Sequence, residues 1–179
     1  MLKKHTTKQI WLTLTVIALF VLLPFIFAVN QTAAEAGTVR EKTARAGWTK
    51  CTAAICIDTV IIGRDSGSEK TLAFTEATYS KNGKVISRRG GFATKNVKFK
   101  QDGLEKAWVD APVKVDLCNA KDVCKKGETV QVKASWTGTG NTWEDQEASM
   151  RVRDAKVGCS IDGKKPGNLK FANLTEGMK

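Results

Sequence analysis

The chain has 179 residues, of which 29 are lysine or arginine and 18 are aspartate or glutamate, so its formal charge at pH 7 is +11. Its single histidine is His5, which excludes Ser-His and Cys-His catalytic pairs and histidine-based zinc sites from everything beyond that residue. The sequence therefore predicts a non-enzymatic protein that needs no cofactor and no metal ion.

The first 36 residues have the pattern of an export signal. Three lysines (Lys3, Lys4 and Lys8) precede an uncharged apolar run over residues 10–29, and about 20 such residues suffice to span a membrane as a helix. The small-x-small pattern that follows predicts cleavage by signal peptidase after Ala36. Because the apolar run is long, an uncleaved anchor that contacts the membrane through residues 10–29 is the alternative. Both interpretations place the remainder outside the cell, in the medium or at the cell surface.

The exported part is expected to be one domain that follows a short linker. Cleavage would remove three lysines and one glutamate, which leaves 26 basic and 17 acidic residues and a charge of +9. Residues 37–47 are charged and predict a linker or one frayed helical turn. Residues 48–179 have the length of a single β domain.

All five cysteines lie in this exported part, where thiols oxidise, so disulfides are expected. Cys51 and Cys56 bracket four residues, and Cys118 and Cys124 bracket a loop between two strand-like runs. Neither pair has the C-x-x-C spacing of a redox motif. We therefore expect the disulfides Cys51–Cys56 and Cys118–Cys124, with Cys159 as a free, buried thiol. A bond from Cys159 to Cys51 or Cys56 is the alternative.

From residue 56 onward, the apolar residues recur with the period of two that is typical of half-buried antiparallel strands. In residues 107–118 the alternation places Val109, Ala111 and Val113 on one face. In residues 128–138 it places every second residue inward: Val130, Val132, Ala134 and Trp136. Each of these runs therefore predicts a strand with one buried face.

Phase slips and turn signals divide the rest of the chain. The apolar phase slips near Arg153, which predicts a bulge, and Asn82-Gly83 predicts a hairpin turn. Similar signals separate about eight short strands in all. The predicted fold is an all-β, antiparallel β-sandwich held by disulfides, with a small β-barrel as the alternative.

Residues 81–100 contain seven lysines and arginines and no acid, with aromatic residues among them. A basic and aromatic surface suits an anionic polymer, such as a wall polymer, an acidic glycan or lipid head groups. Trp143 follows a Gly-Thr-rich turn, out of phase with the buried row, and is predicted to be exposed. The predicted binding residues are Lys84, Arg88, Arg89, Lys95, Lys98, Lys100 and Trp143.

These features predict an exported binding domain whose partner is an anionic polymer of the cell envelope. A protein-protein interaction or inhibitor module, with another surface protein as its partner, is the alternative. A third hypothesis is a glycan hydrolase that uses two carboxylates, with Glu144, Asp145 and Glu147 as candidates. The expected compartment and the lack of nucleic-acid-binding motifs argue against nucleic acid.

Overall fold

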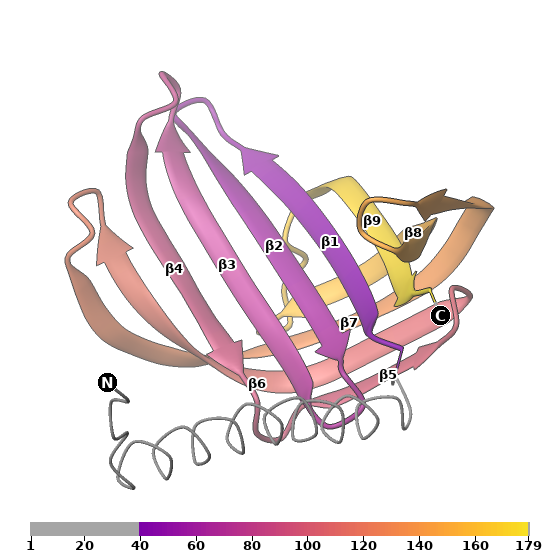
Figure 1. Ribbon diagram of the computed structural model, residues 1–179. Helices are drawn as coiled ribbons and strands as arrows, with labels where there is room; N and C mark the ends of the chain where they lie inside the picture. Colours follow the sequence, from indigo (N-terminus) through magenta and orange to yellow (C-terminus); the bar gives the residue numbers. More distant parts are fainter. Residues whose placement is uncertain (1–39, 179) are drawn as a thin grey trace, which may run out of the picture. The chain divides into compact units, whose positions relative to one another are not determined.

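The structure of the protein is a computed structural model that describes residues 40–178 (Figure 1). The predicted leader, its cleavage site after Ala36 and the first residues of the predicted linker lie outside the described residues. Within residues 40–178, no helix is long and apolar enough to cross a membrane.

The described chain is built from nine strands, and every strand pairs with its neighbours in antiparallel fashion. The strands are β1 (Lys42–Cys51), β2 (Ile55–Asp65), β3 (Lys70–Ser80), β4 (Val85–Ala93), β5 (Lys98–Asp102), β6 (Lys106–Asn119), β7 (Cys124–Asp145), β8 (Met150–Ile161) and β9 (Asn168–Gly177).

The predicted antiparallel all-β fold is confirmed, and its strands belong to one continuous sheet. The strand order is β4-β3-β2-β1-β9-β8-β7-β6-β5. Residues 87–90 of β4 also pair with residues 116–119 of β6, so this seam closes the sheet into a ring. The closed ring is the barrel form of the two arrangements that the sequence pattern allowed.

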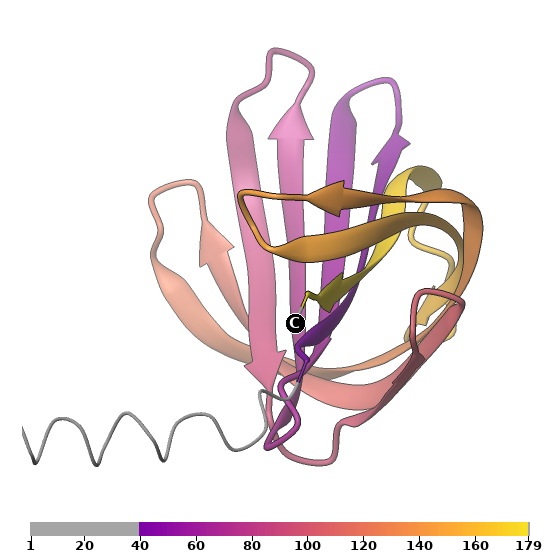
Figure 2. The ribbon, with the colours of Figure 1, turned by 45° about the vertical axis from the view of Figure 1, so that its right-hand side comes forward.

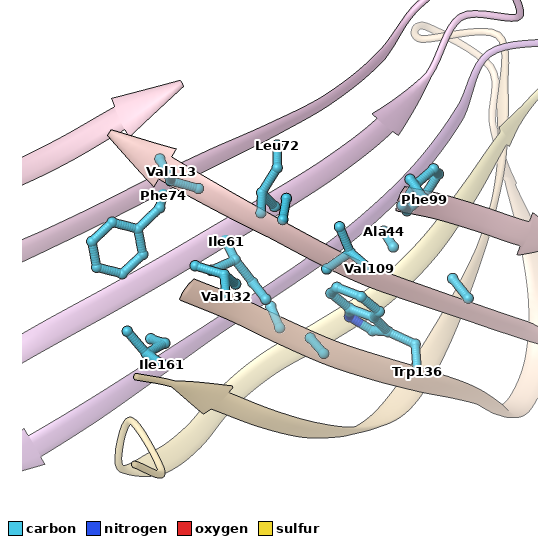
Figure 3. Close-up of a cluster of buried hydrophobic side chains, with 14 of the residues drawn as sticks. Ala44, Ile61, Leu72, Phe74, Phe99, Val109, Val113, Val132, Trp136 and Ile161 are labelled. Carbon is cyan, nitrogen blue, oxygen red and sulfur yellow. The ribbon is translucent and has the colours of Figure 1, made fainter. Parts of the chain in front are cut away.

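The ring has two layers with the hydrophobic core between them. β1 to β4 lie side by side in one layer, and β6 and β7 cross behind them at a steep angle, as Figures 1 and 2 show. Side chains from both layers meet in the core, where Trp136, Phe74 and Phe99 are among the largest fully buried residues (Figure 3). Burial of one Phe-sized side chain contributes roughly 1.5–3 kcal/mol. The inward rows predicted in β6 and β7 are therefore confirmed for Val109 and Trp136.

Trp136 also ties the two layers together through a polar contact. Its indole Nε1 donates a hydrogen bond to the backbone carbonyl of Arg45 in β1 at 3.0 Å. The buried indole nitrogen thus has a partner, which a buried tryptophan needs.

The linker predicted over residues 37–47 is wrong for its second half, because β1 begins at Lys42. Ala44 and Ala46 are fully buried and alternate with the outward-facing Arg45, which is the pattern of a half-buried strand. Alanines between charged residues carry little apolar signal. Here β2 and β9 flank β1 on both sides and supply the burial.

The predicted bulge and the predicted hairpin turn are both confirmed. Residues 139–141 of β7 oppose the single residue Asp154 of β8. Val152 and Ala155 are both buried although they are three residues apart in β8, as the phase slip predicts. The turn around Gly83, whose φ is 75°, joins β3 to β4.

β5 extends the sheet beyond the seam, and buried side chains and hydrogen bonds fix its inner side. It pairs with β6 alone, while Phe99 and Gln101 are buried. The side-chain nitrogen of Gln101 donates to the Thr175 carbonyl of β9 at 2.9 Å, and Lys42 Nζ donates to the Gln101 carbonyl at 3.2 Å. The outward side chains of β5 consequently share a surface with β6 rather than with β4.

Both predicted disulfides are present, and each links the two strands of a β-hairpin at the end next to the connecting loop. Cys51–Cys56 joins β1 to β2, and Cys118–Cys124 joins β6 to β7. In each pair the cysteines are directly opposite in the strand register, with Cα atoms 4.0 Å apart. Closing such short loops contributes roughly 2 kcal/mol each in the chain-entropy model. The two bonds fit an extracellular or otherwise oxidising environment.

Cys159 is a free thiol, as predicted, and it is partly buried rather than fully buried. It lies opposite the inward-facing Ala134 in the register of β7 and β8. Burial raises the pKa of the Cys159 thiol from 9.0 to about 12. The thiol is therefore protonated at neutral pH and a poor nucleophile.

Candidate polyanion-binding site

The structure separates the predicted basic residues, and Arg89 is the one that points toward the core. Its guanidinium donates two hydrogen bonds to the Glu76 carboxylate, at 2.8 and 3.1 Å, and lies 5.6 Å from the centroid of the buried Phe74 ring. A bidentate ion pair combined with a cation–π contact is a strong interaction between neighbouring strands. Arg89 therefore has its charge balanced locally and stabilises the pairing of β3 with β4.

Lys84, Arg88 and Lys95 are exposed but spread along β4 and its flanking turns. At about 3.3 Å per residue, Lys84 and Arg88 are about 13 Å apart along the strand. Arg88 forms an ion pair with Asp122 at 3.1 Å. Lys84 precedes β4, Arg88 lies within it at the seam with β6, and Lys95 follows it, so the three residues do not form one compact cluster.

Lys98 and Lys100 face outward on β5 and join a surface that residues 81–100 alone do not reveal. Because β5 pairs with β6, Lys100 lies opposite Trp108 and Lys98 lies opposite Asp110. The rows continue across β7 to β8. One row is Lys100, Trp108, Ser135 and Gly158, and the next is Lys98, Asp110, Lys133 and Ser160.

We call this surface the lysine-tryptophan face. Trp108 lies at its centre with 43% of its surface exposed. Residues from a third row, with Lys106 opposite Thr137 and Thr137 opposite Lys156, extend it on one side. The face consists of Trp108 and six exposed lysines: Lys98, Lys100, Lys106, Lys133, Lys156 and Lys165.

A hollow of about 520 Å³ opens in the lysine-tryptophan face. Its lining includes Trp108 from β6, the small residues Ser135 and Gly158 from β7 and β8, and Lys165 from the loop after β8. Gly158 leaves room in the hollow, since a Cβ at this position would have Ser135 Oγ as its nearest neighbour at 3.5 Å. The hollow is shallow and widely open to solvent, so a ligand bound there would keep one side exposed.

The charge of this face is strongly one-sided. Two outward carboxylates, Asp102 and Asp110, lie in these rows with five of the lysines, and the loop that carries Lys165 adds the exposed Asp162. Asp110 is engaged on both oxygens, because Gln131 donates to one and Lys133 Nζ lies 3.6 Å from the other. Within residues 40–178, Lys100, Lys156 and Lys165 form no ion pair, so their charges are free to meet a ligand.

Trp143 is exposed, as predicted, at 46% of its surface, but it is not part of this face. It lies near the end of β7, eight residues from Ser135, or about 25 Å along the strand. Glu144, Asp145 and Glu147 are exposed around the turn that follows, where Asp145 accepts a hydrogen bond from the Ala148 amide at 3.0 Å. Within the described residues, no group of three acidic, cysteine or histidine side chains could hold a metal ion.

A second outer surface, on β4, β3, β2, β1 and β9, has a different composition. Phe92, Ala73 and Ile62 lie in one row, and Val60, Gly47 and Phe171 lie in the next. We call these six residues the apolar face; on β1 the first row continues to the exposed Arg45. Phe92 is 60% exposed beside a hollow of about 420 Å³. The Phe171 ring lies over Gly47, where a Cβ would come within 2.4 Å of the ring.

Comparison of the chain with family models, curated proteins and solved structures found no match.

Trp108 and the lysines of β6 to β8 are absent from the predicted site, although part of the signal was present in the sequence. The alternation that places Val109 inside also places Trp108 outside. That β5 pairs with β6, and β6 with β7, is what joins Lys98 and Lys100 to Trp108 and Lys133. Strand parity thus predicts which side a residue faces, and strand order decides which residues it meets.

Proposed function

We propose that the protein is an exported, non-enzymatic domain that binds an anionic polymer of the cell envelope through the lysine-tryptophan face. The observation that supports this function is the gathering of six exposed lysines on one face with an exposed indole, beside a hollow that Lys133 and Lys165 line. The two disulfides suit the exported location.

The dimensions of the face favour a polymer over a single small anion. Its rows cross four strands, and three strand spacings of about 4.8 Å span roughly 14 Å. One exposed ion pair contributes only about 0.2–1 kcal/mol. Useful affinity therefore requires several lysines to meet several anionic groups at once, and such binding weakens as salt screens the charges.

The first test reverses charges on this face while the fold is kept. Lys100→Glu, Lys156→Glu and Lys165→Glu alter three exposed lysines without breaking an ion pair within the described residues. At roughly 0.5 kcal/mol for each of six lost charge units, affinity should fall about 100-fold at low salt. Binding to isolated cell envelopes, polyphosphate, polyglutamate and polygalacturonate is measured over a salt series.

The matched control makes the same charge change elsewhere. Lys81→Glu, Lys84→Glu and Lys121→Glu alter exposed lysines at the β3–β4 turn and in the Cys118–Cys124 loop. This triple variant should keep most of its affinity. Equal losses in the two triple variants would refute a localised site, and binding that salt does not weaken would refute the electrostatic function.

A further inference from the structure

The hollow in the lysine-tryptophan face contains more than positive charge. Asp110 lies in its lining, together with the hydroxyls of Ser135 and Ser160. The Asp110 side chain keeps about a third of its surface exposed (33%) despite its contacts with Gln131 and Lys133. A carboxylate in this position accepts hydrogen bonds from ligand hydroxyls and repels phosphates and carboxylates. A groove built for dense anionic charge alone gains nothing from it.

The aromatic content of the face is also informative. Within residues 40–178, Trp108 is the one aromatic residue in the rows of the lysine-tryptophan face, since the exposed Trp143 of β7 lies outside that face. Proteins that hold single-stranded nucleic acid stack successive bases on several aromatic side chains. One exposed indole beside hydroxyls and a carboxylate instead offers a platform for a single flat, hydroxyl-bearing ring.

We infer that the hollow beside Trp108 holds one sugar ring of an anionic polysaccharide, with the ring stacked on the indole and the acidic groups of the polymer on the flanking lysines. This inference rests on the proposed function and specifies its ligand class. The ring hydroxyls face Asp110, Ser135 and Ser160. Lys100 lies directly across from Trp108, where Cβ atoms are about 5 Å apart, so its ammonium group reaches an acidic substituent of the stacked ring.

The position of Gly158 supports this arrangement. Gly158 is in the same row as Trp108, separated from it by Ser135 alone, and two strand spacings of about 4.8 Å separate the two residues. A side chain larger than glycine or serine in this row would occupy the space next to the indole. The two small residues keep one face of the ring site open.

The experiment compares polymers that differ in backbone chemistry. Affinities of the disulfide-bonded protein are measured for polygalacturonate, polyglutamate, polyphosphate and an oligothymidylate at one salt concentration. We expect polygalacturonate to bind most tightly. Trp108→Ala should weaken polygalacturonate binding about tenfold and leave polyphosphate binding within about twofold, whereas Trp108→Phe should retain part of the preference. Trp143→Ala, which alters an exposed tryptophan outside the face, should change neither affinity.

Asp110→Asn tests whether the Asp110 carboxylate contacts the ligand. If Asp110 had only a structural role, its replacement would change the affinities for all polymers in the same direction. Loss of the negative charge should strengthen polyphosphate binding and weaken polygalacturonate binding. Equal affinity for all polymers, unaffected by Trp108→Ala, would overturn the sugar assignment and leave the proposed function standing. Preference for oligothymidylate would overturn it in favour of a nucleic-acid ligand. If the unaltered protein binds no polyanion, the proposed function itself fails.

Discussion

The two outer faces of the closed sheet each contain a glycine in mid-strand with an aromatic side chain in the same row. On the apolar face, Phe171 is directly opposite Gly47 and its ring covers the glycine, which is buried. On the lysine-tryptophan face, Trp108 is two strands away from Gly158, which is exposed. The Phe171 ring occupies the space directly over Gly47, with a smaller hollow of about 300 Å³ beside it, whereas the space over Gly158 is open.

This difference separates a stabilising feature from a binding feature. An aromatic ring that covers a glycine on a neighbouring strand compensates for the missing side chain and shields the backbone. The Phe171–Gly47 pair therefore belongs to the stability of β1 and β9. No ring covers Gly158. The space over this glycine is therefore available to a ligand, beside the Trp108 indole and the lysines of the face.

The difference between the two faces should appear most strongly in the free energy of unfolding of variants at the two glycines. Gly47→Ala should lower the free energy of unfolding by about 2 kcal/mol, because a Cβ at this position would lie 2.4 Å from the Phe171 ring. Gly158→Ala should leave stability unchanged or raise it by up to about 1 kcal/mol, because its Cβ has room and alanine loses less backbone entropy than glycine. Urea unfolding of both variants measures the two values. Similar costs at the two glycines would end the distinction between the faces.

A double variant sharpens the same comparison at a smaller scale. Phe171→Ala alone should cost about 1 kcal/mol, since a ring that is already 44% exposed loses part of its contact area. In the Gly47→Ala background, removal of the ring also removes the clash. The double variant should therefore be more stable than the sum of the single effects by about 1 kcal/mol. Additive effects would show that the ring yields without strain.

The last test concerns pH, and it reports on the inner side of β8 beneath the open depression. Cys159 follows Gly158, so its thiol belongs to the inward row, and burial raises its pKa from 9.0 to about 12. In the unfolded chain the thiol ionises near pH 9. The stabilisation from the buried neutral thiol is thus fully present below pH 9 and is lost as pH rises from about 9 to about 12.

Comparison with Cys159→Ala isolates the contribution of this thiol to the pH dependence of stability. The stability difference between the two proteins should be constant below pH 9 and shift against the thiol-containing protein above it. Alkylation of Cys159 in the native protein should also be much slower than in urea. Rapid alkylation of native protein at pH 8 would show that the inner side of β8 opens to solvent.

Strand parity carried most of the fold information in the sequence. Three patterns reflect geometry within a hairpin or a single strand: the alternation around Val109, the phase slip at Arg153 and the spacing of the four bonded cysteines. Local patterns of this kind are visible without knowledge of the tertiary fold.

The candidate site depended on contacts that no local pattern encodes. Arg88 and Arg89 are adjacent in sequence, yet one faces solvent and the other is held by Glu76. Lys165 reaches Trp108 across the hollow from a loop more than 50 residues away in the chain. β1 was missed for the related reason that its burial comes from neighbouring strands and not from its own composition.

The pairing of β1 with β9 places the first and last strands of the domain next to each other in the middle of the sheet. A chain that emerges N-terminus first can pair β1 to β4 early, but one edge of β1 has no partner until β9 arrives. The hydrogen bond from Thr175 to the Thr43 carbonyl joins residues 132 positions apart. Contacts of such long sequence separation form slowly. The ring can therefore close only after β9 has emerged, however early β1 to β4 have paired.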